Sequence, residues 1–544
     1  MYFCHENIFA MSNLMNRMTM QQLRQIAAMS ALCCLFAACS TTKELSNKIG
    51  NSSKNKSIVI FYDNDVHGGI DGYAKIAGLR DAVAKSDTAW AAAVSCGDYL
   101  SGGVACTLKE GMYIANIISS TGYDVLTLGN HEFDFGVPRL MELVPQMHAP
   151  VICANLYSQQ SQQPMLPPYV MKQYGDKRVA FVGVTTPESM TLEGYAFFDL
   201  NGRKLYDMRT ADFYQLVQQN VDKARSEGAD YVVMLSHLGE EDGETGVTSH
   251  RLVAATRGVD VVLDGHTHHV FEREEVRNLD GQPVPVTQTG TRFANVGKLV
   301  ITGDGRFLTS LIAVADIPFN SEKVAATIDS VNADMHEVTS RQLCQTDYEL
   351  TINDAKGDRL CRLAETNLGD LVSDAYVDFL DSDIGLMNGG GLRNSIPAGS
   401  VCYGDVVNAL PFINRMCKIE VTGQQLFDML VKCTSNLPLE EGFFPHVSGM
   451  TYTIHSKRNT VSDVKVLNKD SRVYEPLDLH RKYSVATIDY YSRGGFYDML
   501  KNCPFLVSTK VLNRDCVADY LGKLTPADIE RYRSTEHRIT IIDD

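Results

Sequence analysis

Hydrophobic and polar positions follow two alternating patterns along most of the chain. From residue 58 to residue 318, short apolar runs of strand length are separated by stretches with helical spacing, such as "DFYQLVQQNVDKARSEG". Strands that alternate with helices predict βαβ units and an α/β sheet. The segment 319–344 includes "SEKVAATIDSVNADMHEVTSRQL", which is helical in pattern and has no strand character. We therefore predict a connector helix there.

A second mixed domain is predicted over residues 345–523. It contains a helical pattern in "DLVSDAYVDFL" and a strand pattern in "YSVATIDYY". Residues 524–544 follow as a C-terminal tail. With 544 residues, two or three domains are expected, and this division gives two.

Residues 1–38 are predicted to be a signal peptide. Their apolar run, "IAAMSALCCLFAA", follows two arginines and is shorter than the ~20 residues that a membrane span needs. The stretch "LFAACS" resembles a bacterial lipoprotein signal, in which Cys39 becomes the lipidated first residue; a plain signal peptide and an uncleaved anchor are the alternatives. Residues 39–57 predict a flexible tether. We expect an exported protein, periplasmic or on the outer membrane or cell surface, that meets the membrane through its lipid only.

Charge and cysteine content narrow the classes of function. The net charge of −16 argues against a surface for nucleic-acid polymers, although metals or arginines in a cleft can still hold phosphates. Fourteen cysteines occur in the chain, and those after the leader have no repeated short spacing, so no zinc ribbon is predicted.

Five separate apolar runs end in residues that can bind a cation. In α/β folds, ligand sites collect at the carboxyl ends of the strands, so these positions are predicted to converge. Each run alone is more often an ordinary strand exit or turn, but five coincidences favour one shared site. The candidate residues are Asp65 and His67, Asp98, Asn130 and His131, His237, and His266 and His268.

The residue types indicate which ions would bind. Carboxylates, an amide oxygen and imidazoles, without a thiolate, suit Zn²⁺, Mn²⁺ or Fe better than Ca²⁺. Even seven of these eight residues exceed what one tetrahedral site can use, and two ions bridged by one carboxylate are the economical arrangement.

These motifs carry a resemblance. The series D-x-H, G-D, G-N-H-E, H and G-H-x-H resembles the calcineurin-type metallophosphoesterases, and the form "GNHEFD" is similar to the 5′-nucleotidase/UDP-sugar hydrolase family. The resemblance implies an α/β protein with an N-terminal four-layer αββα metallophosphoesterase domain. A connector helix and a C-terminal mixed α+β substrate-binding domain would follow.

The resemblance also assigns roles within the metal site. Asp98 would bridge the two ions, His131 would contact the phosphoryl oxygens or the leaving group, and Asp134 would orient the His131 ring. Glu132 is expected to be structural. One metal would take Asp65, His67, Asp98 and His268, and the other Asp98, Asn130, His237 and His266.

In the second domain, the resemblance implies a substrate site built from "NGGGLRN", "LPFIN" and "TIDYYSRGG". Phe412 and Tyr490 would clamp the base, and the phosphates and ribose would be bound by polar residues. These are Arg362, Asn388 and Arg393, with Asn414 also expected in the site. Relatives carry an Asp where this chain has Phe496, and Asp498 lies two positions later, so the natural substrate stays open.

The expected function is metal-dependent hydrolysis of nucleotide phosphate esters. Nucleoside 5′-monophosphates are the first expected substrates, and UDP-sugars and cyclic nucleotides are further possibilities. A phosphatase of broad specificity and a non-catalytic nucleotide-binding lipoprotein of the cell surface are the alternatives.

Overall fold

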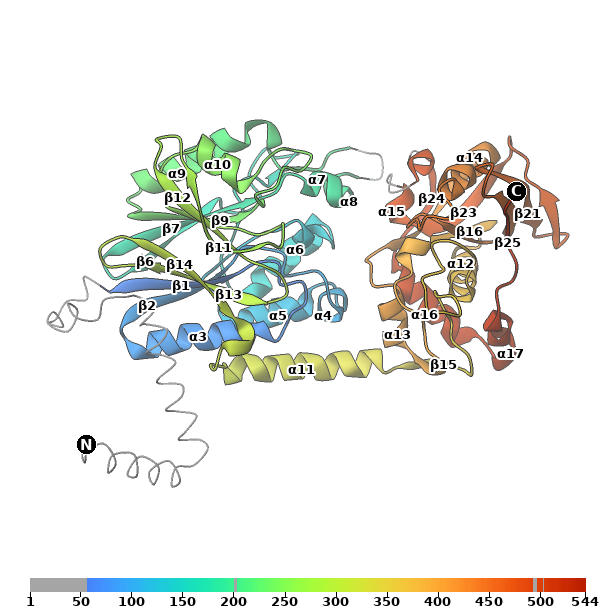
Figure 1. Cartoon of the computed structure of the whole chain (residues 1–544), viewed down its shortest axis with the longest axis horizontal. Coiled ribbons are helices and arrows are strands. Elements are labelled where there is room, and N and C mark those ends of the chain that lie inside the picture. Colours follow the sequence, from blue (N-terminus) through green and yellow to red (C-terminus); the bar gives the residue numbers. More distant parts are fainter. Residues whose placement is uncertain (1–55, 200–202, 493–496, 502) are drawn as a thin grey trace, which may run out of the picture.

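The computed structural model describes residues 56–199, 203–492, 497–501 and 503–544. Two bodies of sheets and helices lie side by side, and helix α11 (Glu322–Thr339) runs from one to the other (Figure 1). The predicted signal peptide, Cys39 and most of the tether lie outside the described residues. None of the helices in those ranges is long and apolar enough to cross a membrane.

The N-terminal domain contains two six-stranded sheets. The first sheet has the order β14-β13-β1-β2-β3-β4, with strands Phe307–Ala313, Asn295–Ile301, Ser57–Asp63, Ala89–Ser95, Val125–Thr127 and Val151–Ile152. The second has the order β11-β12-β10-β9-β7-β6, with strands Val270–Arg277, Pro283–Thr289, Val261–Leu263, Tyr231–His237, Lys177–Thr185 and Tyr169–Tyr174. The strands β1, β2, β3 and β4 run parallel, as do β7, β9 and β10.

Three hydrophobic clusters define the layers of this domain. Along β1, Ile58 and Ile60 point into a core shared by the two sheets, whereas Val59 and Phe61 point to the opposite side, towards helices. Successive side chains of a strand face opposite sides of a sheet, so β1 serves two cores. The helices α3 (Gly72–Ser86) and α5 (Met112–Thr121) pack outside the first sheet, and α9 (Phe213–Ser226) packs outside the second. The predicted αββα architecture is therefore confirmed.

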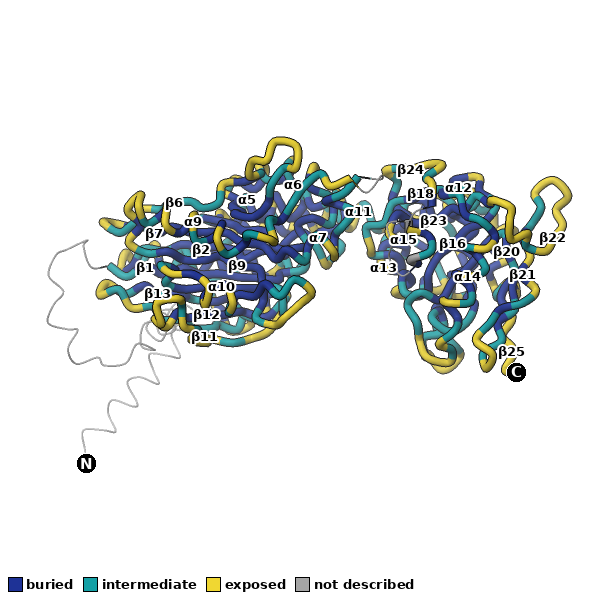
Figure 2. The backbone as a smooth tube through the Cα atoms, turned by 90° about the horizontal axis from the view of Figure 1, so that it is seen from above, coloured by how far each residue is buried: buried dark blue, intermediate teal, exposed yellow. Residues whose placement is uncertain are grey.

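The buried backbone of each domain lies in its central strands, with exposed loops around them (Figure 2). The remaining helices of the N-terminal domain are α6 (Val137–Leu143) and α10 (Ser249–Ala255), with several short elements. These are α4 (Val104–Thr107), η3 (His131–Phe133), η4 (Val144–Met147), β5 (Tyr157–Ser158), α7 (Ser189–Leu192), α8 (Gly194–Phe197), β8 (Tyr206–Asp207), η5 (Thr210–Asp212) and η6 (Val314–Asp316).

The C-terminal domain is mixed α+β, as predicted. Its five-stranded sheet has the order β19-β16-β23-β18-β24, with strands Pro445–Ser448, Ile384–Asn388, Lys482–Ile488, Arg415–Thr422 and Phe505–Leu512. A four-stranded sheet has the order β22-β21-β20-β25, with strands Val473–Pro476, Thr460–Asn468, Met450–His455 and Ile539–Ile542. A small pair joins β15 (Gln342–Thr346) to β17 (Gly399–Cys402).

Helix α12 (Asn367–Leu380) is almost entirely buried. It begins after Thr366, whose hydroxyl accepts a hydrogen bond from the Gly369 N–H, the usual way to satisfy a free N-terminal donor. The other helical segments are η7 (Gly389–Gly391), α13 (Tyr403–Ala409), α14 (Gly423–Thr434), α15 (Asp489–Ser492), η8 (Asp498–Leu500), α16 (Asn513–Lys523), α17 (Pro526–Ile529) and η9 (Glu530–Arg533).

Two segments differ from the prediction in detail. The helix of the connector ends at Thr339, and Gln342–Thr346 already forms a strand with β17. The predicted tail is a folded part of the domain, because β25 pairs in parallel with β20. The buried Arg538 donates to both carboxylate oxygens of Asp374 on α12, at 2.8 Å each. A charged side chain buried in this way needs such a partner, and the pair holds the tail against the helix.

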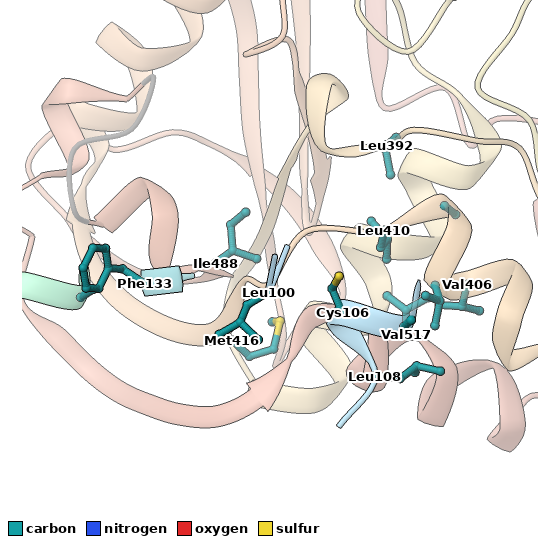
Figure 3. Packing of buried hydrophobic residues seen from close by; sticks show 14 of the residues in the cluster. Leu100, Cys106, Leu108, Phe133, Leu392, Val406, Leu410, Met416, Ile488 and Val517 are labelled. Carbon is teal, nitrogen blue, oxygen red and sulfur yellow. The ribbon is translucent and has the colours of Figure 1, made fainter. Parts of the chain in front are cut away.

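The two domains share an apolar contact. Figure 3 shows Leu100, Cys106 and Leu108 of the N-terminal domain beside residues of the C-terminal domain such as Met416 and Val517, all in one buried cluster. Next to this contact, the guanidinium of the buried Arg514 donates to the Thr107 carbonyl at 2.7 Å. The connector helix is therefore not the only link between the domains.

Candidate metal centre and substrate face

All seven predicted ligands lie at or just beyond strand ends, and they come from both sheets. Asp65 and His67 follow β1, Asp98 follows β2 and Asn130 follows β3, all in the first sheet. In the second sheet, His237 is the last residue of β9, and His266 and His268 follow β10. The ligands of each sheet therefore lie at the carboxyl ends of its strands, as expected. Because the two sheets are stacked, the ligands of one sheet lie close to those of the other.

The first ligand group, Asp65, His67, Asp98 and His268, forms one cluster of potential ligand atoms. The Asp65 Oδ1 atom lies 3.3 Å from His268 Nε2 and 3.7 Å from His67 Nε2. His67 Nε2 lies 3.5 Å from Asp98 Oδ2 and 3.0 Å from His268 Nε2. The nitrogens and the carboxylate oxygens therefore face one common point.

The second ligand group, Asp98, Asn130, His237 and His266, meets the first at Asp98. His237 Nε2 lies 3.2 Å from Asp98 Oδ2, while its Nδ1 is 2.7 Å from the Cys96 carbonyl. His266 Nδ1 lies 3.0 Å from Asn130 Oδ1. Asp98 Oδ2 is thus placed between the two groups, where a bridging carboxylate would lie.

Five of the seven candidate ligands have left-handed backbone conformations, with φ of 51° at Asp65, 42° at His67, 60° at Asp98, 89° at His266 and 61° at His268. Residues other than glycine rarely adopt such angles, and they cluster where function requires an unfavourable geometry. Gly129 precedes Asn130 and packs so closely that a Cβ there would lie 2.1 Å from Asp98 Oδ1. The glycines of the "GD" and "GN" motifs therefore bring the ligand loops together.

Two buried atoms at the centre have no hydrogen-bond partner in the part of the chain that the structure describes, Asp65 Oδ1 and His237 Nε2. Burial opposes protonation of His237, but Asp98 and Asp65 outweigh it and raise its pKa to about 10. Burial also opposes ionisation of Asp98, yet the neighbouring histidines hold its pKa well below the usual range. The carboxylates of the site thus stabilise a positive charge placed beside them. The oxygen and nitrogen donors of the site fit divalent metal ions.

His131 and Asp134 form a pair beside the centre. The His131 Nδ1 atom lies 3.1 Å from an Asp134 carboxylate oxygen, and its backbone N–H donates to Asp98 Oδ1. Burial lowers the pKa of His131, but Asp98 and Asp134 together raise it to about 10. The carboxylate fixes which ring nitrogen points away, as a catalytic imidazole requires.

Glu132 has structural contacts, as expected, and it bonds more backbone groups than the sequence indicated. The fully buried carboxylate accepts hydrogen bonds from the N–H groups of Asp98, Tyr99, Leu100 and Gly129. Burial and the charge of Asp98 raise its pKa to about 7. Glu132 therefore joins the loop that carries Asp98 to the loop that carries Asn130.

The predicted substrate residues lie on the other domain, and Arg393 is close to Phe412. The Arg393 guanidinium lies over the Phe412 ring, 5.7 Å from its centroid. Asn388 is buried and donates to the Gly442 carbonyl, and Arg362 has a buried Nε atom without a partner among the described residues. Phe412 and Tyr490 are 47% and 40% exposed, which is high for aromatic side chains.

A third arginine belongs to this face. Partial burial lowers the pKa of Arg393, and the positive charges of Arg359 and Arg362 lower it further. Sequence reasoning missed Arg359, although its spacing of three residues from Arg362 in "DRLCRL" was a signal. Asn414 is half-buried and accepts a backbone hydrogen bond from Asn513 through its carbonyl. Phe496 and the side chain of Asp498 lie outside the described residues.

The chain is similar to known proteins over most of its length. The model of the 5′-nucleotidase C-terminal domain matches residues 346–502. A second model, of the bacterial capsule synthesis protein PGA_cap, matches residues 78–284 and so leaves out Asp65 and His67. The UshA protein of Escherichia coli (strain K12) is 26% identical over 88% of this chain and 93% of its own length. The 5′-nucleotidase of Vibrio parahaemolyticus is 25% identical over 89% and 92%.

Solved structures show the same architecture. A putative 5′-nucleotidase from Staphylococcus aureus has a TM-score of 0.63 at 21% identity, covering 89% of this chain and all of its own. A 5′-nucleotidase precursor from Thermus thermophilus has a TM-score of 0.57 at 24% identity, covering 90% and 100%. The chain thus has the two-domain fold of these 5′-nucleotidase structures. Its C-terminal half matches the 5′-nucleotidase C-terminal domain, and over most of its length the chain is similar to the UshA and 5′-nucleotidase proteins, as the resemblance predicted.

Proposed function

We propose that this protein is a metal-dependent phosphohydrolase that releases phosphate from nucleotides, foremost from nucleoside 5′-monophosphates. UDP-sugars and cyclic nucleotides are further substrate classes. The observation that carries the proposal is the convergence of seven oxygen and nitrogen donors at the ends of strands from two sheets, five of them in left-handed conformations. The similarity to proteins named 5′-nucleotidase supports the choice of substrate.

The first and second ligand groups would each hold one divalent ion, Zn, Mn or Fe, with Asp98 shared between them. When bound, such ions neutralise phosphoryl charge and lower the pKa of water. The chain keeps the donor atoms ready through its own contacts. Asn64 Nδ2 donates to Asp65 Oδ2 at 2.6 Å, which leaves Oδ1 facing the site. The Cys96 carbonyl accepts from His237 Nδ1 at 2.7 Å, which leaves Nε2 facing the site.

His131 would act on the substrate rather than on the metals. Its Nδ1 is engaged by Asp134, so Nε2 is free to donate a hydrogen bond to the phosphoryl oxygens or to the leaving oxygen. Because the two carboxylates favour the protonated ring, the imidazolium both donates a proton and offsets negative charge.

The C-terminal domain would present the nucleotide. Arg362 and Arg393 would bind phosphate oxygens, for which the planar guanidinium is suited, and Asn388 and Asn414 would contact the ribose or phosphates. Phe412 and Tyr490 would stack on the two faces of the base. The exposure of both rings supports this assignment.

The test is phosphate release from a panel of nucleotides by the full chain, measured with chelator, after removal of the chelator, and with added Mn²⁺ or Zn²⁺. We expect hydrolysis of AMP and related monophosphates that chelator abolishes and added metal restores. Equal rates on simple phosphate esters would favour the broad-specificity phosphatase. Nucleotide binding without hydrolysis under every metal condition would favour the non-catalytic lipoprotein.

The location of the protein is a separate proposal. Cys39, after an apolar leader, would carry a lipid and hold the exported protein at the membrane. In its native host, the Cys39→Ala variant should leave the membrane fraction, because no other anchor is proposed. Sedimentation of that variant with membranes as in the wild type would contradict lipid anchoring.

A further inference from the structure

A short segment after strand β7 lies beside the second ligand group of the candidate metal centre. It contains Thr186 to Glu193 and includes the single-turn helix α7. Two of its carboxylates, Glu188 and Glu193, reach residues of the second ligand group. Neither was singled out as a functional residue by the sequence, although Glu188 follows a strand end exactly as the candidate ligands do.

Glu193 contacts Asn130. Its Oε1 accepts a hydrogen bond from Asn130 Nδ2 at 3.1 Å, and the residue is 4% exposed. The amide of an asparagine presents an oxygen on one side and an NH₂ on the other, so a carboxylate acceptor beside the NH₂ determines which way the amide points. With Glu193 on one side, Asn130 Oδ1 faces His266 Nδ1 at 3.0 Å.

Glu188 contacts His266 from the opposite side of the ring. Its Oε2 lies 3.7 Å from His266 Nε2, and its Oε1 accepts from the Thr245 N–H at 3.3 Å. A histidine that binds a metal through one ring nitrogen almost always donates its other N–H to a carboxylate or carbonyl. The neighbouring His237 also has an acceptor at its second nitrogen, the Cys96 carbonyl at 2.7 Å from Nδ1, whereas Glu188 lies at ion-pair distance from His266.

We propose that Glu188 and Glu193 are positioning residues for the second ligand group. Glu193 turns the amide oxygen of Asn130 towards the centre, and Glu188 holds His266 so that Nδ1 faces the same point. Both carboxylates come from one short segment, so that segment aligns two ligands from different sheets. This inference rests on the proposed function, because it assumes that the second ligand group binds a metal ion.

The test is a titration of Mn²⁺ into the metal-depleted full chain, followed by calorimetry. The wild type should bind two equivalents. Glu193→Leu and Glu188→Leu remove the acceptors, and each should weaken one equivalent by about 10–100-fold, the usual effect of losing such a partner, while the other equivalent is unchanged. Glu193→Gln and Glu188→Gln keep an acceptor oxygen and should restore most of the affinity.

Two measurements separate positioning from folding. The melting temperature of the metal-free protein reports on folding, and Glu193→Ala replaces Glu193→Leu if the latter does not fold. Glu142→Gln, at an exposed ion pair with Arg139 on α6, is the matched control and should bind both equivalents normally. At saturating Mn²⁺, kcat of the Leu variants should recover with KM unchanged.

Normal affinity for both equivalents in the folded Leu or Ala variants would overturn the proposal. An equal loss in the Gln variants would also overturn it, because charge or packing, rather than orientation of the ligands, would then be responsible. If the wild type itself binds no more than one equivalent, the two-metal function fails instead, which distinguishes the two claims.

Discussion

The metal centre and the substrate face of this protein are built in opposite ways. In the candidate metal centre, Asp65, Asp98, Asn130 and His237 are buried and His268 is exposed at the edge. Its donors are held by many short contacts at strand ends, with left-handed backbone at five positions. In the proposed substrate face, most residues lie in loops, with Asn388 at the end of β16 and Tyr490 in α15. Its two aromatic rings are 47% and 40% exposed, and one of its expected positions lies outside the described residues. The proposed chemistry thus depends on side chains packed together at strand ends, and the proposed recognition on a more exposed surface.

The difference implies that substitutions in the two regions should have distinct kinetic effects. A rigid, shared centre makes each ligand essential, because its neighbours cannot take over its role. A more exposed face spreads recognition over stacking and charge, so single changes there should alter affinity more than kcat. The predictions below test this contrast.

The largest effect is expected at the residue shared by both ligand groups. Asp98→Asn should lower kcat by about 10³-fold or more, because the metal ions contribute several kcal/mol of charge stabilisation and Asp98 Oδ2 faces both groups. Phosphate release and metal content per chain measure the two consequences. The exposed Asp304→Asn, in the turn between β13 and β14, is the control. A fully active Asp98→Asn variant would contradict the two-metal centre.

A substitution at His131 should distinguish a role in hydrolysis from a role in metal binding. His131→Ala is expected to bind two metal ions per chain and yet to hydrolyse AMP about 10²–10⁴-fold more slowly, the usual range for general acid help. The control is His148→Ala, an exposed histidine of the same domain. Loss of metal from His131→Ala in elemental analysis would instead identify His131 as a ligand.

These two predictions rest on residues that the sequence alone already indicated. Each ligand follows an apolar run, and a strand end is readable because the period of two is local. The stacking of the sheets was implied only by the resemblance, since pairing between β7 and β9 or between β1 and β13 joins residues far apart in the chain. Glu188 and Glu193 were missed because their partners, His266 and Asn130, are distant in sequence.

The C-terminal tail is a second example of structure that depends on partners distant in sequence. The run "RITII" is too short to be distinguished from a loop by its pattern, and its strand depends on pairing with β20. The salt bridge between Arg538 and Asp374 spans 164 positions. Local patterns predict elements and their ends, whereas contacts of this range become visible only when the chain is folded.

A smaller effect is expected on the stability of the C-terminal domain. Burial lowers the pKa of His446 to about 4, and its Nε2 lies 2.8 Å from the Cys361 carbonyl. The unfolded histidine binds a proton below pH ~6.5, whereas the folded one does not until about pH 4. Its contribution to stability is therefore present above pH ~6.5 and is lost as the pH falls to about 4, by about 3 kcal/mol in total.

Calorimetric unfolding of the full chain between pH 7 and pH 4 checks this prediction. In the wild type, the transition of the C-terminal domain should shift to lower temperature as the pH falls. His446→Gln removes the titrating group, so the shift should be smaller. The same acid shift in wild type and variant would show that other groups cause it, and the assignment to His446 would then be wrong.

The smallest effect concerns the ribose, and it tests the substrate face directly. Phe496 stands where the resemblance leads us to expect an Asp, and a charge-assisted contact of that Asp with the ribose hydroxyls would contribute about 1.5–3 kcal/mol. Stacking on Phe412 and Tyr490 does not need the hydroxyls and contributes roughly 1–3 kcal/mol per base by analogy with nucleic-acid sites. We therefore expect stacking to dominate recognition, so that kcat/KM for AMP exceeds that for dAMP by less than about tenfold, or 1.4 kcal/mol.

A preference of about a hundredfold or more would mean that the hydroxyls are bound after all. Asp498→Ala would then be the variant to measure, because Asp498 is the nearest carboxylate along the chain, and collapse of the preference in that variant would place it at the ribose.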